Sequence, residues 1–372
     1  MKQINVDILK SKIEERIKND FENNNIDAVS LIVNQGGKTL YKNTFGKANE
    51  DSIYRMASMT KPITAVAVMT LFDKGLLDID DLIEKYLPEF SNLYLAEKTE
   101  SGVIKSKPIK NKPTIKHLLT HTSGIMNGEC GFYYETQMSE EDRRTLENSV
   151  NFYSSCGLSF EPFSKEEYSA TAAFDLLSRI VEVLSGKNYS EYLEENIFKP
   201  CNMKNTTFAP SNEQWNRVVT MHDKRDGENA VGNTYEGCVF ENFPVSHYLG
   251  GAGLVSTLED YSNFAEMLLN KGEFKGTRVV SEKAIELIST PHVPKEIMGG
   301  NCRWGLGVRV ITEYGYKLPL GTFGWSGAYG THFWVDFVNK ITAVYLKNSR
   351  FDGGAGAVTA ENFELDVFNS LE

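Results

Sequence analysis

The tetrad Ser58-Met59-Thr60-Lys61 opens an apolar run that extends from Ile63 to Leu76, in a chain of 372 residues. Apolar residues recur there at helical spacing, Pro62 suits the first turn of a helix, and Gly75 suits its end. Ser58 is predicted to cap this helix. Because residues three positions apart share one face of a helix, the Lys61 amine can hold or accept the Ser58 hydroxyl proton. The spacing leaves two interpretations open: an activated nucleophile, or a capped helix with a solvated lysine.

Composition and charge are those of an ordinary globular enzyme. The chain is 41% hydrophobic and 24% charged, with a net charge of −11. Its length suits two domains, or one large domain with an insertion. Nucleic-acid binding needs concentrated Lys and Arg, so we expect no nucleic-acid partner for this acidic chain. The basic run between Lys105 and Lys112 is interpreted as a solvated hairpin arm.

The N-terminus and the cysteines bear on the cellular compartment. Residues 1–25 have apolar positions at helical spacing among many charges, which predicts an amphipathic surface helix rather than a secretion signal. We expect no membrane span and a cytoplasmic location. The cysteines are scattered and form no CxxC pair, so we expect free thiols and neither a zinc nor a redox site; they are Cys130, Cys156, Cys201, Cys238 and Cys302.

Strand patterns lie near both ends of the chain, with a mainly helical stretch between them. The segments 29–33 and 39–45 flank a Gly-Gly hairpin signal, and 332–337 and 341–347 are expected to form two adjacent antiparallel strands. We therefore predict an α+β fold, with an antiparallel sheet built from both chain ends and flanked by helices. Residues 1–56 and 296–372 form the sheet domain in this prediction. Residues 57–295 form a large, mainly helical inserted domain.

Further elements are predicted from periodicity and from stop signals. Helices are expected over 169–184 and 258–269, each followed by a glycine, and over 361–371 near the C-terminus. Residues 94–112 resemble an exposed two-stranded arm that turns at 100–102. The stretch 127–163 is aromatic and has little periodicity, which predicts a loop over a cleft.

Three other segments carry residues suited to catalysis. Tyr168 precedes the predicted helix at 169–184, and a phenol there can act as a general base beside a lysine, since a nearby cation favours its ionised form. The alternative is a surface aromatic. The glycine-rich run 323–331 leads into a strand and suggests close approach of backbone to a ligand, or a flexible turn. His117 and His121 have the spacing of a helical zinc pair, but no HExxH motif follows, and a helix-ending turn explains them better.

Together these segments resemble the serine β-lactamase-related superfamily, which includes class C β-lactamases, D-Ala-D-Ala peptidases of the penicillin-binding protein type and family VIII esterases. The resemblance spans roughly residues 25 to 350, and the order and spacing of the motifs make it specific. It implies an active site in the cleft between the two predicted domains. The motifs are Tyr54-Arg55-Met56-Ala57-Ser58-Met59-Thr60-Lys61, Leu118-Leu119-Thr120-His121-Thr122-Ser123-Gly124, Phe160-Glu161-Pro162 before Tyr168-Ser169, Gly250-Gly251-Ala252-Gly253-Leu254-Val255-Ser256-Thr257, and Gly324-Trp325-Ser326-Gly327.

The resemblance implies a role for each matching residue. Ser58 would be the acylated nucleophile, and Lys61 and Tyr168 would share its deprotonation. Which of the two is the base stays open, because the pair is coupled. The backbone N–H groups of Ser58 and Ala328 would form the oxyanion hole, with Ala328 following the Trp-Ser-Gly triplet on an edge strand. Trp325, Ser326 and Gly327 would bind substrate, and no metal or other cofactor is implied.

Two departures from the family pattern bear on the substrate. Ala170 stands where the β-lactamases and peptidases have the Asn of Tyr-x-Asn, and Trp325 stands where they have the Lys of Lys-Thr-Gly. Their loss should weaken carboxylate-bearing substrates by about 1–3 kcal/mol per charged hydrogen bond. Trp-x-Gly resembles the family VIII esterases instead. Lys347 and Arg350 are candidates for a replacement cation, with a solvated strand end as the alternative interpretation.

We therefore predict a serine hydrolase that forms an acyl-enzyme on Ser58 and acts as a carboxylesterase on small, short-acyl esters. A β-lactamase or a D-Ala-D-Ala or other D-amino-acid peptidase of the same fold is one alternative. An acyltransferase and a non-catalytic or slowly acylated binding protein are the others. In the catalytic cases the expected partner is a small-molecule ester or amide.

Overall fold

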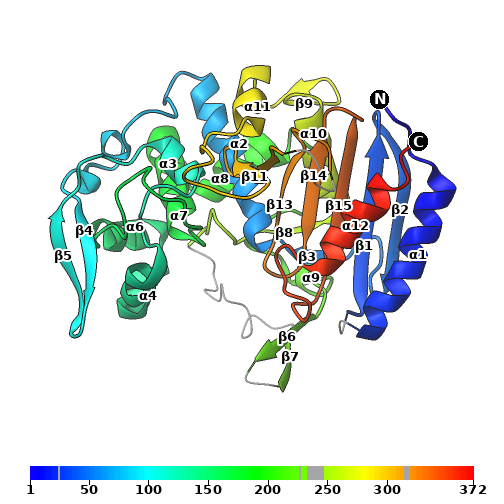
Figure 1. Ribbon diagram of the computed structural model, residues 1–372, viewed down its shortest axis with the longest axis horizontal. Coiled ribbons are helices and arrows are strands. Elements are labelled where there is room, and N and C mark those ends of the chain that lie inside the picture. The colour runs from blue at the N-terminus through cyan, green and yellow to red at the C-terminus, as the bar shows by residue number, and fades with distance from the viewer. Residues whose placement is uncertain (24–25, 226–227, 233–246, 314–317) are drawn as a thin grey trace.

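The fold is organised around a seven-stranded antiparallel sheet. The computed structural model describes residues 1–372 except 24–25, 226–227, 233–246 and 314–317. The strand order in the described residues is β11-β12-β13-β14-β15-β1-β2. Since β1 pairs with β15, the sheet is built from both chain ends, which confirms the predicted α+β fold (Figure 1). Its strands are β1 (Ala28–Gln35), β2 (Lys38–Gly46), β11 (Cys302–Trp304), β12 (Arg309–Ile311), β13 (Phe323–Ser326), β14 (His332–Asp336) and β15 (Ile341–Lys347).

Tight turns join the two strand pairs that the sequence predicted. Gly36 and Gly37 connect β1 to β2 with φ of 59° and 77°, the left-handed values that a two-residue hairpin turn requires. β14 and β15 are adjacent and antiparallel, as predicted. Both β1 and β15 are buried along their whole length. This continuous burial replaces the alternation of a half-exposed strand because helices cover both faces of the sheet.

Helices lie on both faces of the sheet. α10 (Leu258–Leu269) packs on one face against β14, β15 and β1, and has the bounds that the sequence predicted. On the other face, α1 (Val6–Asn23) and α12 (Val358–Phe368) pack against each other (Figure 1). α1 buries Leu9, Ile13 and Ile17 at helical spacing, so the amphipathic helix predicted for residues 1–25 is confirmed.

The middle of the chain is mainly helical, with α2 (Thr60–Asp73) at its centre. α2 is buried continuously from Thr60 to Leu71 and packs against α7 and α11. Gly75 has φ of 68° just beyond the helix end, as predicted. The other elements of this part are β3 (Ile53–Arg55), α3 (Ile115–Leu119), α7 (Ala172–Ser185), α8 (Tyr189–Leu193), a π-helical turn η4 (Glu194–Phe198), α9 (Asn212–Trp215), β8 (Val255–Thr257) and α11 (Glu282–Ser289), with the short pieces η2 (Ile83–Lys85), η3 (Pro88–Phe90), β6 (Met221–Arg225), β7 (Glu228–Gly232), β9 (Glu273–Phe274) and β10 (Thr277–Arg278).

The exposed arm predicted at 94–112 is confirmed as the hairpin β4 (Tyr94–Thr99) and β5 (Gly102–Pro108). The loop predicted at 127–163 is wrong. That stretch holds α4 (Gly128–Gln137), α5 (Glu140–Arg144) and α6 (Leu146–Ser155). Helices of five to ten residues carry too few apolar positions to show a period. Ser139 and Thr145 cap α5 and α6 by accepting backbone N–H groups.

Two helices begin at other residues than predicted. α7 starts at Ala172 rather than 169, and α12 spans Val358–Phe368 rather than 361–371. The residue limits of the two domains remain a prediction. α10 lies inside the span assigned to the helical domain and nevertheless packs against the sheet.

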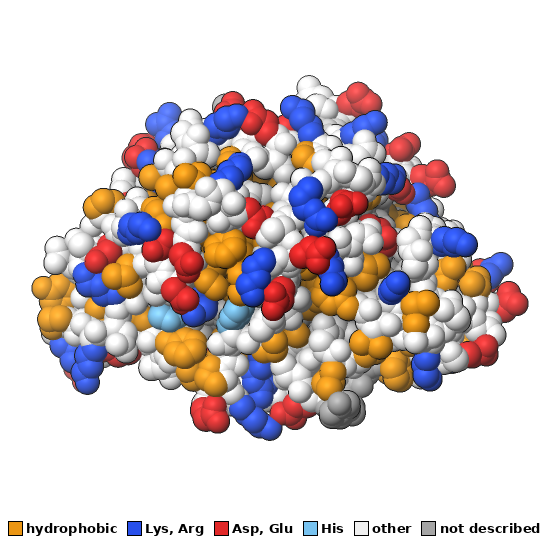
Figure 2. All heavy atoms as spheres, turned by 90° about the horizontal axis from the view of Figure 1, so that it is seen from above, with side chains coloured by type: hydrophobic (Ala, Val, Ile, Leu, Met, Phe, Trp, Pro, Cys, Tyr) orange, Lys and Arg blue, Asp and Glu red, His pale blue; other side chains and the backbone are white. Residues whose placement is uncertain are grey.

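The surface carries charges of both signs (Figure 2), and the cysteines in the described residues are free thiols. None of the helices in the described ranges combines the length and apolar character that crossing a bilayer requires. Figure 2 shows acidic and basic side chains interspersed over one face of the molecule. Cys156, Cys201 and Cys302 are buried free thiols, and Cys130 is a partly exposed one. The prediction for Cys238 falls outside the described residues.

An ion pair between α1 and α12 generates a prediction about stability. The Arg16 guanidinium donates to both carboxylate oxygens of Asp366, at 2.5 and 2.6 Å, and the Asp366 side chain is 3% exposed. Arg16→Ala leaves that buried carboxylate unpaired, so we expect a loss of about 2–4 kcal/mol in the free energy of unfolding. The double variant Arg16→Met, Asp366→Leu should recover most of the loss. Urea unfolding measures both.

The control is Lys10→Ala, also on α1. Lys10 pairs with Glu14 at 4.0 Å on the solvent side, and its removal should change stability by less than about 0.5 kcal/mol. An Arg16→Ala effect as small as that of Lys10→Ala would mean that the pairing of the two terminal helices is not important for stability.

Candidate active site

Ser58 lies in a strained turn just before α2. It is the middle residue of a 3-10 turn, Ala57–Met59, and Ala57 has φ of 44°, a left-handed value that is costly for a residue with a Cβ atom. The predicted capping role is wrong, because Met59 precedes α2 and no side chain caps the helix there. The Ser58 side chain is partly exposed and accepts a hydrogen bond from Tyr168 instead.

The structure brings Ser58, Lys61 and Tyr168 together. The Tyr168 hydroxyl donates to Ser58 Oγ at 2.7 Å, and Lys61 Nζ lies 3.4 Å from the same oxygen. The Lys61 ammonium is fully buried and also lies 4.9 Å from the centre of the Tyr168 ring. Tyr168 is 37% exposed, so the hydroxyl cluster is open to molecules arriving from solvent.

Two backbone carbonyls hold the Lys61 ammonium. Nζ donates to Ala170 O at 2.6 Å and to Gly251 O at 2.9 Å. Together with Ser58 Oγ these oxygens match the three donors of an ammonium group. A Cβ atom at Gly251 would lie 2.8 Å from Ala170 O, so a glycine is needed for this approach. Ala170, which departs from the family pattern, therefore contributes through its backbone.

A loop after α3 positions Tyr168. His121, with φ of 57°, accepts the Ser169 N–H on Nδ1 at 3.0 Å, and its carbonyl accepts the Glu167 N–H at 3.0 Å. These two bonds bracket Tyr168. The His121 ring also packs 4.5 Å from the Tyr168 ring. Burial, with the nearby charge of Lys61, holds the pKa of His121 well below its ordinary value, so the imidazole is neutral and can accept.

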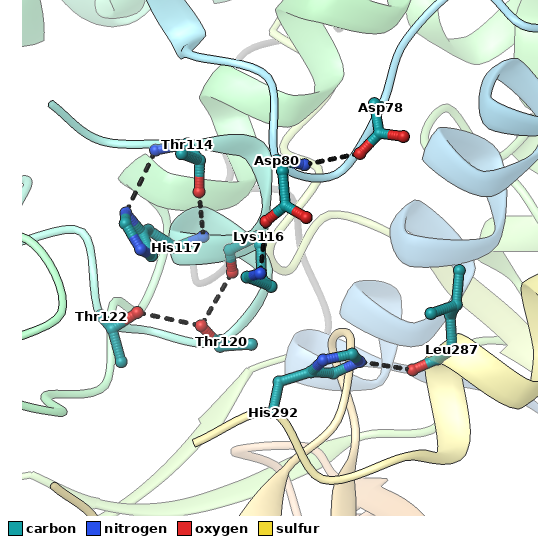
Figure 3. A network of polar contacts seen from close by, with 9 residues as sticks. All are labelled: Asp78, Asp80, Thr114, Lys116, His117, Thr120, Thr122, Leu287 and His292. Carbon is teal, nitrogen blue, oxygen red and sulfur yellow. Dashed lines mark hydrogen bonds and ion pairs between the residues drawn. The ribbon is translucent and has the colours of Figure 1, made fainter. Parts of the chain in front are cut away.

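His117, four residues before His121, lies on α3 and caps the start of that helix. His117 Nδ1 accepts the Thr114 N–H at 3.2 Å, while the Thr114 hydroxyl accepts the His117 N–H, which makes a capping box at the start of α3 (Figure 3). Burial lowers the pKa of His117 to about 4. The helix-ending turn that the sequence predicted at His121 is confirmed. His117 thus stabilises the start of α3, and His121 lies in the turn that follows the end of this helix.

An aromatic wall stands beside Tyr168. We use this name for Trp304 of β11 and Trp325 of β13, whose rings lie 4.6 Å apart and 6.0 and 5.5 Å from Tyr168. The exposed Arg309 guanidinium lies 5.0 Å above the Trp325 ring. Within the described chain Arg309 makes no hydrogen bond or ion pair. Sequence reasoning missed Trp304 and Arg309, because neither belongs to a motif.

The predicted edge strand is wrong, because β13 lies between β12 and β14. The pairing with β12 nevertheless stops at Gly324, so Trp325 and Ser326 have β14 on one side and no β12 partner on the other. Gly327 lies so close to Met56 that a Cβ atom would sit 2.3 Å from the Met56 carbonyl oxygen. Ala328 packs on a small cluster that contains Ala57, next to Ser58.

Ser326 points away from the aromatic wall. Its side chain bonds to His332 on β14, on the sheet face opposite to Trp325. The interpretation of Lys347 as a solvated strand end is also wrong. The Lys347 side chain is completely buried against Asp352, and burial lowers its pKa. Arg350 is exposed, with its guanidinium 5.9 Å from the Tyr329 ring. Neither cation contacts Trp325.

The chain is similar to known proteins over most of its length. The family model described as Beta-lactamase matches residues 13–364. Esterase EstB of Burkholderia gladioli is 28% identical over 370 residues, which cover 90% of this chain and 88% of that protein. N-acetylmuramyl-L-alanine amidase of Bacillus subtilis is 26% identical over 362 residues, covering 90% and 78%.

Solved structures show the same fold. EstCE1, described as a hydrolase with promiscuous acyltransferase activity, superposes with a TM-score of 0.80 at 21% identity, over 98% of both chains. The family match covers nearly the whole chain, including Ser58, Lys61, Tyr168 and the strand that carries Trp325. The chain therefore belongs to the beta-lactamase family and is a serine hydrolase of that fold.

Proposed function

We propose that the protein is a carboxylesterase that forms an acyl-enzyme on Ser58. The observation that carries the proposal is the convergence of two proton-handling groups on one hydroxyl, with Tyr168 at 2.7 Å and Lys61 at 3.4 Å from Ser58 Oγ. In this proposal the reacting form of the Lys61–Tyr168 pair has already lost one proton, so that either Lys61 Nζ or the Tyr168 oxygen can accept another. Ser58 Oγ attacks the ester carbonyl while its proton passes to that pair. The pair returns the proton to the departing alkoxide, and water then hydrolyses the acyl-enzyme.

The backbone N–H groups of Ser58 and Ala328 are the proposed oxyanion hole. The Ala328 N–H makes no hydrogen bond within the described residues, so it is free to meet a developing oxyanion. Gly327 supports this position, because only a residue without a Cβ atom lets the strand end approach Met56 so closely.

Two features favour small, uncharged esters. Trp325 offers an apolar ring where a lysine would offer charge, and Ala170 offers no side-chain amide. A carboxylate placed beside the aromatic wall would lose hydration without gaining a lysine partner. The similarity to EstB is consistent with this choice, at 28% identity.

A second candidate function, amide or β-lactam hydrolysis, is favoured by Arg309. Its exposed guanidinium, stacked above Trp325, is a cation that a substrate carboxylate can pair with. The similarity to the Bacillus subtilis amidase points the same way. The two candidates differ in leaving group and in the charge of the substrate.

Ser58→Ala tests the nucleophile. We expect wild-type protein to hydrolyse p-nitrophenyl butyrate faster than a chromogenic cephalosporin, and the variant to lose about 10³-fold or more of the ester activity. Spectrophotometric rates measure both. A butyryl adduct on the Ser58 peptide, trapped by acid quench and detected by mass spectrometry, identifies the attacked atom. Full activity in the variant would rule out Ser58, and faster cephalosporin cleavage would select the amidase.

Trp325→Lys tests the apolar wall. The new ammonium should raise kcat/KM for the anionic cephalosporin relative to the butyrate ester by about 10-fold, the value of one charge-assisted hydrogen bond. Trp325→Met is the control, since it removes the ring without adding charge and should change both substrates alike. An equal shift in selectivity from both variants would show that ring removal, rather than charge, is responsible.

His121→Phe tests how Tyr168 is held. The phenyl ring keeps the apolar packing but cannot accept the Ser169 N–H, so we expect kcat for the ester to fall about 10-fold with little change in KM. His121→Asn retains an acceptor and tolerates positive φ, so it should recover part of kcat. If the two variants lost kcat equally, the Ser169 hydrogen bond would not be what orients Tyr168.

A further inference from the structure

A second hydroxyl in the molecule is bonded to an imidazole. Ser326 Oγ lies 2.8 Å from His332 Nδ1, and His332 Nε2 lies 2.9 Å from Glu364 Oε1. The three residues come from β13, β14 and α12. In the tautomer whose Nε2–H donates to the carboxylate, Nδ1 is the acceptor for the serine proton. A carboxylate that orients an imidazole, which in turn accepts from a serine, is the arrangement that activates serine nucleophiles.

This chain of bonds lies on the other face of the sheet from Ser58. Ser326 pairs with His332 across the strands, so both side chains share one face, while Trp325 and Phe333 share the other. Trp334, two residues beyond His332, packs against Phe363 of α12 with ring centres 5.1 Å apart. The Ser326 hydroxyl is therefore directed toward α12, and the Lys61–Tyr168 pair acts on the opposite side.

A pocket opens onto all three residues. Its volume is ≈ 70 Å³, between the sheet and α12, which is smaller than a typical small-molecule site and suits an acyl group of acetyl size. Ser326, His332 and Glu364 are 7%, 9% and 6% exposed. Most of the remaining wall is apolar and includes Ile311, Leu318 and Trp334. The second oxygen of Glu364, Oε2, is buried without a hydrogen-bond partner in the described residues.

We propose that Ser326 is a second nucleophilic site, activated by His332 and Glu364, that takes acetyl-sized acyl groups from small esters. The Ser326 Oγ–H proton passes to His332 Nδ1 as Oγ bonds to the ester carbonyl carbon. The ester C–O bond then breaks, and the leaving alkoxide takes the proton from the imidazolium. The products are an acylated Ser326 and a free alcohol. Glu364 stabilises the transient imidazolium. The reaction is independent of the function proposed for Ser58.

Labelling in a Ser58→Ala background tests the site separately from the first nucleophile. The full-length variant is treated with methanesulfonyl fluoride, a probe of acetyl size that sulfonylates activated serines with loss of fluoride. Peptide mass spectrometry then locates the adduct. We expect one adduct, on Ser326, and none after the further change Ser326→Ala. Wild-type protein labelled in parallel reports Ser58, so failure at one serine is distinguished from failure at the other.

Variants of the partners decide whether the relay is responsible. Glu364→Gln and His332→Phe in the same background should each slow labelling of Ser326 at least 10-fold. Thr322→Val is the matched control, because Thr322 lines the same pocket with a buried hydroxyl that has no imidazole partner. It should leave the rate unchanged. A folded Ser58→Ala protein with no adduct, an adduct on another residue, or labelling indifferent to Glu364→Gln would each overturn the proposal.

Discussion

The buried ammonium of Lys61 is the constraint on which the rest of the site depends. Removing an isolated charge from water costs several kcal/mol unless polar groups replace the lost hydration. Here the carbonyls of Ala170 and Gly251 supply that replacement at 2.6 and 2.9 Å, and Ser58 completes the donor set. Three segments far apart in the chain must therefore meet at one nitrogen. The ammonium specifies their relative positions as well as taking part in the proposed chemistry.

The sequence predicted those features of the fold that depend on local physics. The Gly36-Gly37 hairpin, the bounds of α10 and the Ser-x-x-Lys spacing follow from turn chemistry and periodicity. The helices between residues 127 and 155 were missed, because their stability depends on caps and on packing rather than on an apolar stripe. Lys347 was misinterpreted for a related reason. Its sequence shows a charged strand end, but its burial depends on Asp352 in a following loop.

The site residues likewise divide into those that local motifs reveal and those that only the tertiary fold brings together. The motifs identified Ser58, Lys61 and Tyr168, whose spacing or order is visible in the chain. Trp304 and Arg309 lie on neighbouring strands and reach Tyr168 and Trp325 only through the sheet register. His121 was noticed for the wrong property. Its spacing from His117 is that of metal ligands, but both histidines accept backbone N–H groups instead. His117 Nδ1 accepts from Thr114 at the start of α3, and His121 Nδ1 accepts from Ser169. The role of His121 depends on residues 167–169, which are distant in the chain, so the local sequence does not reveal it.

The pleat of β13 gives one short motif two environments. The Trp325 side chain forms the aromatic wall with Trp304, and Ser326 faces the pocket under α12, because successive strand residues point to opposite faces. In the proposed function the side chain at 325 lies beside substrates that reach Ser58. The side chain at 326 bonds to His332, which in turn bonds to Glu364. Gly327 then brings the backbone beside Met56, where no side chain fits. Changes at 326 and 327 consequently act on the second pocket and on the strand end. A change at 325 acts on substrate selection in the proposed function and also on the second pocket, which Trp325 lines as well.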